Sequence, residues 1–163
     1  LLDRLSMFMG AALNAENAAI LVATKAHRES LMQSLQTYGV DMAAAVEQGR
    51  YITLDAADMV SPFMVDGMLE ADRFLQSFGQ LILQAANAAQ GKQPRVAVFG
   101  EGTDLLWKQG NTEAAIQVEK LGTQISKRYD VDILCGYSMG GQCVMEEEVL
   151  QRICSEHSVV YRR

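Results

Sequence analysis

Side chains that could bind a polar ligand follow directly after predicted strands. Asp55 comes after the apolar run Tyr51–Leu54, and Glu101 comes after the run Val96–Gly100. His27 stands at the start of a helix that follows the run Ala18–Ala23. In open α/β sheets, ligands bind just beyond the carboxyl ends of the strands. These positions therefore predict a ligand-binding site at that edge of a sheet.

Each of these residues also has a purely structural interpretation. Asp55 and Glu101 could cap the helix or turn that follows, since acidic groups favour helix N-termini. His27 could simply pack at the start of its helix. Trp107, the single tryptophan, could belong to the core or could line an apolar pocket near Glu101. The residues alone leave both interpretations open.

Motifs for catalysis are incomplete. The segment Gly100–Gly102 lacks the full glycine spacing of a nucleotide loop, and no phosphate-loop motif occurs. Gly136–Gly140 matches the nucleophile-elbow string with Ser138 at its centre. Its possible partners, among Glu146–Glu148 and His157, follow too closely for a hydrolase. We therefore expect no catalytic residues and interpret the Ser138 segment as a loop at the edge of the sheet.

The composition narrows the class further. The three cysteines form no Cys-x-x-Cys pair and the two histidines have no ligand-like spacing, so we expect neither a metal nor a cofactor. Free thiols fit a reducing cytosol, which predicts a cytoplasmic protein. The net charge of −6 argues against nucleic-acid binding and against an anionic membrane surface. No run has the ~18 apolar residues of a membrane span. The first residues lack the basic region, long apolar core and cleavage site of a signal peptide, so we expect none.

The apolar periodicity predicts an α/β fold over residues 1–163 as a single domain. The chain opens in mid-pattern at Leu1, so we expect it to be a fragment of a longer protein. Strands separated by helices predict a mainly parallel central sheet of about five strands with helices on both faces, in three layers. Strands are expected at 18–23, 51–54, 96–99, 131–137 and 159–161, and helices at 1–13, 26–38, 41–48, 70–90, 144–155 and after Asn111.

Several motifs, spread over nearly the whole chain, resemble the MEDS sensory domain. The family's opening segment, with a histidine and an aromatic pair, is absent here. The matching runs are Asn17–Arg28, Phe63–Met68, Arg73–Phe74, Phe99–Glu101, Leu106–Trp107, Gly110–Asn111, Leu134–Tyr137 and Ile153–Ser158.

The resemblance implies a sensor of small hydrocarbon derivatives in prokaryotic signalling proteins. It also implies a fold related to RecA-like ATPases that have lost the phosphate loop. Glu101 stands where such ATPases keep a magnesium-binding carboxylate. The dipeptide Thr24-Lys25 stands where they carry a catalytic acid. By the same resemblance Thr24, His27, Arg28 and Glu101 lie together at one end of the sheet.

We therefore expect a cytoplasmic, non-enzymatic input domain that binds a small organic ligand. Glu101 or His27 would fix its polar group, with Asp55 nearby, while Trp107 and Tyr137 supply apolar contact. The expected partner is a downstream histidine kinase, PAS or DNA-binding output module in the same chain, with homodimerisation possible. The domain itself would bind neither nucleic acid nor membrane. The alternatives are an interaction or dimerisation module without a ligand and, more remotely, a degenerate nucleotide-binding or hydrolase domain.

Overall fold

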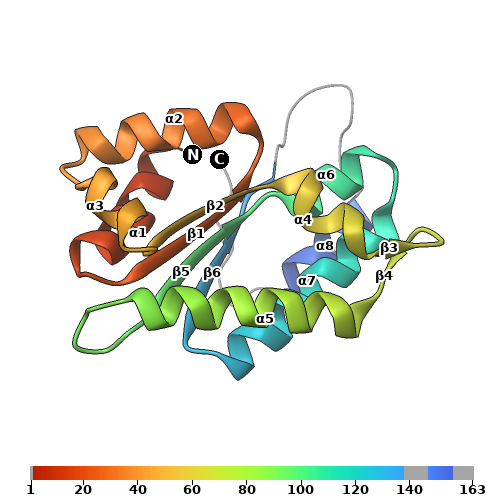
Figure 1. Ribbon diagram of the computed structural model, residues 1–163. Coiled ribbons are helices and arrows are strands. Elements are labelled where there is room, and N and C mark those ends of the chain that lie inside the picture. Colours follow the sequence, from red (N-terminus) through yellow and green to blue (C-terminus); the bar gives the residue numbers. More distant parts are fainter. Residues whose placement is uncertain (1, 138–146, 156–163) are drawn as a thin grey trace.

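The computed structural model describes residues 2–137 and 147–155, which fold around a parallel sheet (Figure 1). The predicted α/β class is confirmed, and the fifth predicted strand, at 159–161, lies outside the described residues. The strands of this sheet, in spatial order, are β2 (Tyr51–Asp55), β1 (Ala18–Ala23), β5 (Val96–Gly100) and β6 (Val131–Cys135).

Helices cover both faces of the sheet and produce the expected three layers (Figure 1). None of the helices in the described ranges is both long and apolar enough to cross a membrane. One face carries α1 (Leu2–Asn14), α2 (Lys25–Thr37) and α3 (Met42–Glu47). The other carries α4 (Ala56–Val60), α5 (Ala71–Ala88), α6 (Gly102–Lys108), α7 (Thr112–Arg128) and α8 (Glu147–Ser155).

Strand β1 is the centre of the core because it is buried on both sides along its whole length. Successive side chains of a strand point to opposite faces. Accordingly Ala18, Ile20 and Val22 join the larger core beneath α5 and α7, and the residues between them join the smaller core beneath α1 and α2. A run without polar alternation is what such a doubly covered strand requires.

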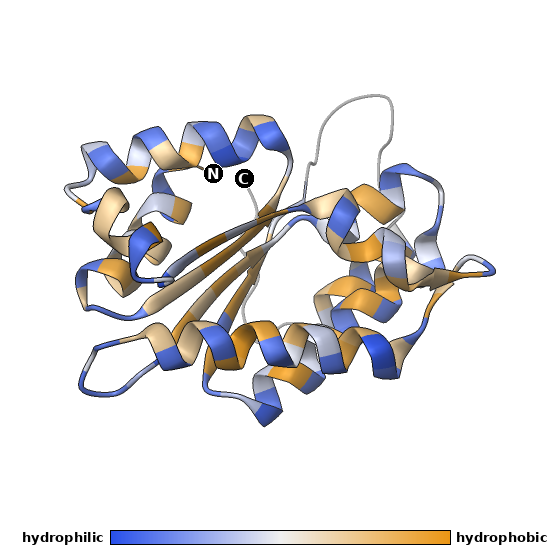
Figure 2. Cartoon of the chain, viewed as in Figure 1, coloured by the Kyte–Doolittle hydropathy of each residue, from blue (hydrophilic) through white to orange (hydrophobic). Residues whose placement is uncertain are grey.

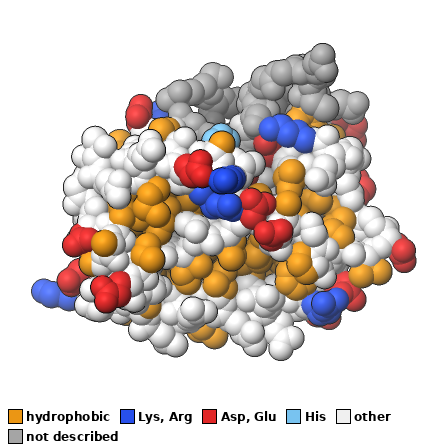
Figure 3. Space-filling model, turned by 45° about the horizontal axis from the view of Figure 1, so that its top comes forward, with side chains coloured by type: hydrophobic (Ala, Val, Ile, Leu, Met, Phe, Trp, Pro, Cys, Tyr) orange, Lys and Arg blue, Asp and Glu red, His pale blue; other side chains and the backbone are white. Residues whose placement is uncertain are grey.

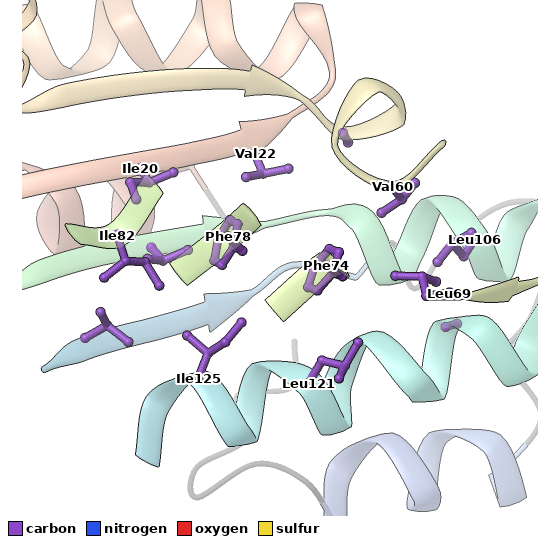
Figure 4. Close-up of a cluster of buried hydrophobic side chains, with 14 of the residues drawn as sticks. Ile20, Val22, Val60, Leu69, Phe74, Phe78, Ile82, Leu106, Leu121 and Ile125 are labelled. Carbon is purple, nitrogen blue, oxygen red and sulfur yellow. The ribbon is translucent and has the colours of Figure 1, made fainter. Parts of the chain in front are cut away.

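The larger core is built by the apolar stripes of α5 and α7 against the sheet. Figure 4 shows Phe74, Phe78 and Ile82 from α5 grouped with Ile20 and Val22 of β1. The rings of Phe74 and Phe78 stack with centroids 5.9 Å apart. Figure 2 shows that the strands are mostly hydrophobic, whereas the helices around them carry both hydrophobic and hydrophilic residues. The helical spacing of these residues in the sequence thus predicts the buried face.

The direction in which successive strands are added to the sheet reverses between β1 and β5, although the strands stay parallel. The chain passes from β1 to β2 on one side, then crosses by way of α4 and α5 to place β5 on the other side of β1. In the register between them, Val22 pairs with Gly100. A reversal of this kind leaves a crevice beyond the carboxyl ends of the two strands, where ligands bind in open α/β sheets.

Three local features differ from the prediction. Helix α4 was not predicted, because its five residues are too few to show a period. Helix α6 was not predicted, because its seven residues are too few to show a clear period. The segment 61–69, for which no helix or strand was expected, contains a 3₁₀ turn (Ser61–Phe63) and the hairpin strands β3 (Met64–Val65) and β4 (Met68–Leu69). Gln117 of α7 holds this hairpin, because its side-chain amide bonds to both the backbone N–H and the carbonyl of Leu69 at 2.9 Å.

The burial of α5 predicts unequal effects at two adjacent positions. Ile82 is 2% exposed within the larger core, whereas Leu83 is 51% exposed. Ile82→Ala is expected to lower the free energy of unfolding by about 2–5 kcal/mol through lost burial and a cavity. The matched control Leu83→Ala should change it by less than about 0.5 kcal/mol. Urea unfolding of both variants checks this, and equal effects would contradict the assigned face.

Candidate functional site

Glu101 links the end of β5 to the start of α2. Its Oε2 accepts a hydrogen bond from the backbone N–H of Thr24 at 3.0 Å, and its Oε1 lies 2.5 Å from Nδ1 of His27. Its own backbone N–H donates to the carbonyl of Val22 at 2.9 Å. Glu101 occupies the N-cap position of α6, yet its side chain makes no capping hydrogen bond. The side-chain cap interpretation is therefore wrong for Glu101.

Asp55 combines the two roles that the sequence left open. Its Oδ1 accepts from the backbone N–H of Ala57 at 3.0 Å and so caps α4. Its Oδ2 lies 2.9 Å from Nη1 of Arg28. The same Arg28 nitrogen donates to the carbonyl of Ala23 at 3.1 Å. Asp55 thus holds the helix that follows it and also pairs with the neighbouring cation.

Five of the seven predicted site residues meet at this carboxyl edge, and we refer to them as the edge cluster: Thr24, His27, Arg28, Asp55 and Glu101. They come from three adjacent strand ends, β2, β1 and β5, joined through α2. Figure 3 shows acidic and basic side chains and a histidine gathered on one face. Within the cluster each carboxylate faces a nitrogen group, so two polar pairs lie side by side at the ends of the strands.

Trp107 and Tyr137 have other surroundings. Trp107 is 8% exposed and belongs to the larger core, in agreement with its structural interpretation as a core residue. The hydroxyl of Tyr137 donates a hydrogen bond to Oε1 of Glu119. The same oxygen accepts from the hydroxyl of Thr103 at 2.6 Å, and the thiol of Cys135 lies 3.5 Å from Oε2. We call Thr103, Glu119, Cys135 and Tyr137 the Glu119 cluster.

The sequence analysis did not identify Glu119. It is 4% exposed and lies on the buried face of α7, three residues after Ile116 and four after Ala115. A carboxylate on the apolar stripe of a helix is the signal that could have found it. A buried carboxylate needs hydrogen-bond donors, and here Thr103 and Tyr137 provide them.

Burial alters the ionisation of the groups around Glu119. Burial is the main cause that raises the pKa of the Cys135 thiol well above its usual value, and the neighbouring Glu119 carboxylate raises it further. Burial, together with Cys135 and Glu119, raises the pKa of Tyr137. Both groups therefore stay protonated at neutral pH and donate to the carboxylate. A thiol whose pKa is raised in this way is a weak nucleophile at neutral pH.

The described residues offer little for other chemistry. They contain no group of three histidine, cysteine or acidic residues that could hold a metal ion. Ser138, Cys143, Glu146 and His157, which the sequence analysis considered, lie outside the described residues. Two shallow hollows, of about 210 and 270 Å³, run along the outer side of α5. They lie away from the strand ends that carry the edge cluster.

Comparison with known proteins gives one finding. A family model described as "MEDS: MEthanogen/methylotroph, DcmR Sensory domain" matches residues 1–158. No curated protein and no solved structure matches the chain.

Two buried phenols predict how stability depends on high pH. Burial raises the pKa of Tyr51 to about 12 against an opposing effect of Arg28, and the pKa of Tyr137 is also raised. Folding therefore favours the protonated phenols. Their contribution to the free energy of unfolding is complete below the unfolded value, about 10, and is lost as the pH rises above it.

Spectrophotometric titration checks this expectation. At about pH 11, the native protein should show fewer phenolates than the chain unfolded in urea. Tyr51→Phe and Tyr137→Phe should each reduce that difference by one phenol. Equal phenolate counts in the native and unfolded protein would contradict the assigned burial of both hydroxyls.

Proposed function

The chain belongs to the MEDS family, a family of sensory domains, and we propose on this premise that it is the input domain of a prokaryotic signalling protein. It binds a small hydrocarbon derivative, or a similar small organic molecule, beyond the carboxyl ends of β1 and β5. Its output partner is a histidine kinase, PAS or DNA-binding module in the same chain. The domain carries out recognition and no chemical conversion.

The observation that carries this proposal is the position of the edge cluster. Thr24, His27 and Glu101 lie beyond the ends of β1 and β5, where the strand order reverses. The side chain of His27 is 54% exposed, whereas that of Glu101 is 9% exposed. One group of this pair is therefore open to a ligand and the other is held by the fold, as a preorganised binding site requires.

The connections of the edge cluster also support a sensing role. Glu101 directly precedes α6, and Thr103 on α6 bonds to Glu119 on α7. Helix α7 is tied to α8 by two hydrogen bonds from Arg152 to Glu113, at 2.9 and 3.1 Å. A ligand that binds two arrangements of Glu101 with different affinities would shift this whole row of helices between two populations. We propose that the output module reads that shift.

A second candidate, binding of a partner protein without any ligand, is favoured by one part of the surface. The hollow of about 270 Å³ beside α5 is lined partly by Leu75, Leu83 and Tyr129. Val65 and Met68, on the hairpin, are 48% and 43% exposed. Apolar groups at these places suit a protein contact, including one with a second copy of the chain.

Thermal-shift measurements test the proposed function. Small alcohols, halocarbons, carboxylic acids and nucleotides are the probes. A compound that binds only the native state at roughly a hundredfold excess over its Kd adds about 2.7 kcal/mol to stability. His27→Ala should abolish that gain, measured against the unliganded variant itself, because loss of the His27 donor to the buried Glu101 lowers the starting stability.

Lys25→Ala is the matched control. Lys25 lies on the same turn of α2 with its side chain 80% exposed, so the response to the ligand should be retained. A response that survives in His27→Ala would remove the edge cluster from the site. Absence of a response to every probe, combined with dimerisation that Leu83→Ala weakens, would favour the second candidate.

A further inference from the structure

The contact between His27 and Glu101 determines which ring nitrogen carries the proton. A carboxylate has lone pairs and no hydrogen, so it can only accept. Nδ1 of His27 lies 2.5 Å from Oε1 of Glu101 and must therefore be the donor. When the imidazole is neutral, one nitrogen donates and the other accepts, so in the neutral ring Nε2 carries the lone pair.

Both oxygens of Glu101 already accept a hydrogen bond within the fold. One oxygen accepts from the backbone of Thr24 and the other from His27. With its side chain only 9% exposed, Glu101 positions the ring and does not reach out to a ligand. In the described part of the chain, Nε2 of His27 has no hydrogen-bond partner, and the ring is more than half exposed. Nε2 is therefore the atom that this pair presents.

The neighbouring cations are already paired. Arg28 bonds to the carboxylate of Asp55 and to the carbonyl of Ala23. Lys25 lies 3.8 Å from the carboxylate of Glu29 on the same helix. An anionic ligand would have to break one of these pairs, whereas a neutral donor would find Nε2 ready to accept.

Resting on the proposed function, we infer that the ligand's polar group is a neutral hydrogen-bond donor such as a hydroxyl, and that it donates to Nε2 of His27. Glu101 acts as the positioning residue that selects donors by fixing the ring proton on Nδ1. Molecules that carry only acceptors, such as ethers and ketones, bind less well, because the lone pair of their oxygen would face the lone pair on Nε2 of His27.

Glu101→Gln should reverse this selection. The N–H of Thr24 needs an oxygen, which turns the glutamine NH₂ towards Nδ1. Because the NH₂ donates, Nδ1 must accept, and the ring proton moves to Nε2. The variant would then present a donor and favour acceptor ligands. Glu29→Gln, also on α2 and with its side chain 66% exposed in the native protein, is the matched control and should change nothing.

The first measurement needs no ligand. Long-range proton–nitrogen correlation spectra of the ¹⁵N-labelled protein, recorded at about pH 8 where histidine is ordinarily neutral, distinguish the two tautomers. His27→Ala identifies the signals of His27 by their absence. We expect the proton on Nδ1 in the native protein and in Glu29→Gln, and on Nε2 in Glu101→Gln. A native ring with its proton on Nε2, or an even mixture, overturns the inference.

The second measurement compares two isomers, butanol and diethyl ether, by titration of the His27 ring signals. The native protein should bind butanol roughly tenfold more tightly than the ether, the effect of one net hydrogen bond. Glu101→Gln should narrow or reverse that ratio. Equal binding of both isomers overturns donor selection and leaves the proposed function standing. Failure of butanol to bind overturns the inference, while a different thermal-shift hit lost in His27→Ala would still preserve the proposed function.

Discussion

Burial of β1 on both faces is the constraint on which the rest of the structure depends. Each of its six residues is buried. A parallel strand of this kind needs a helical layer on either side, since its neighbours cannot be joined by tight turns. The helices α1 and α2 meet that need on one face, and α4 and α5 meet it on the other. The position of Thr24, immediately after β1, follows from the same packing.

The layered fold was predictable because its signals are local. Continuous apolar runs marked β1 and β5, short and mostly apolar runs marked β2 and β6, and stripes at helical spacing marked α5 and α7. Asn111 was correctly predicted as the cap of α7, where its side chain accepts from the backbone N–H of Ala114. The unpredicted elements are short ones. Helix α6 and the hairpin owe their conformation to packing on α7, and the sequence carries no periodic trace of such contacts.

The edge cluster was predictable for a different reason. Carboxyl ends of parallel strands share one edge, so residues directly after them converge whatever lies between. This reasoning, with the family resemblance, brought Glu101, Asp55 and His27 together. It could not give their pairing, because hydrogen bonds depend on side-chain directions. The Glu119 cluster was missed for a related reason. Its members lie 16 to 18 residues from Glu119 along the chain, and the fold alone joins them.

The bond between the Val22 carbonyl and the Glu101 N–H extends the ladder between β1 and β5 right up to the edge cluster. A slip of one residue in this register would turn every side chain of β5 to the opposite face, and Glu101 would then point away from α2. Thr24 and Glu101 are separated by 77 positions in the chain. The site therefore has no local precursor in the unfolded chain and forms only when distant segments condense into the sheet. Binding of the proposed ligand would therefore be coupled to cooperative folding, since any opening of β5 away from β1 separates Glu101 from Thr24.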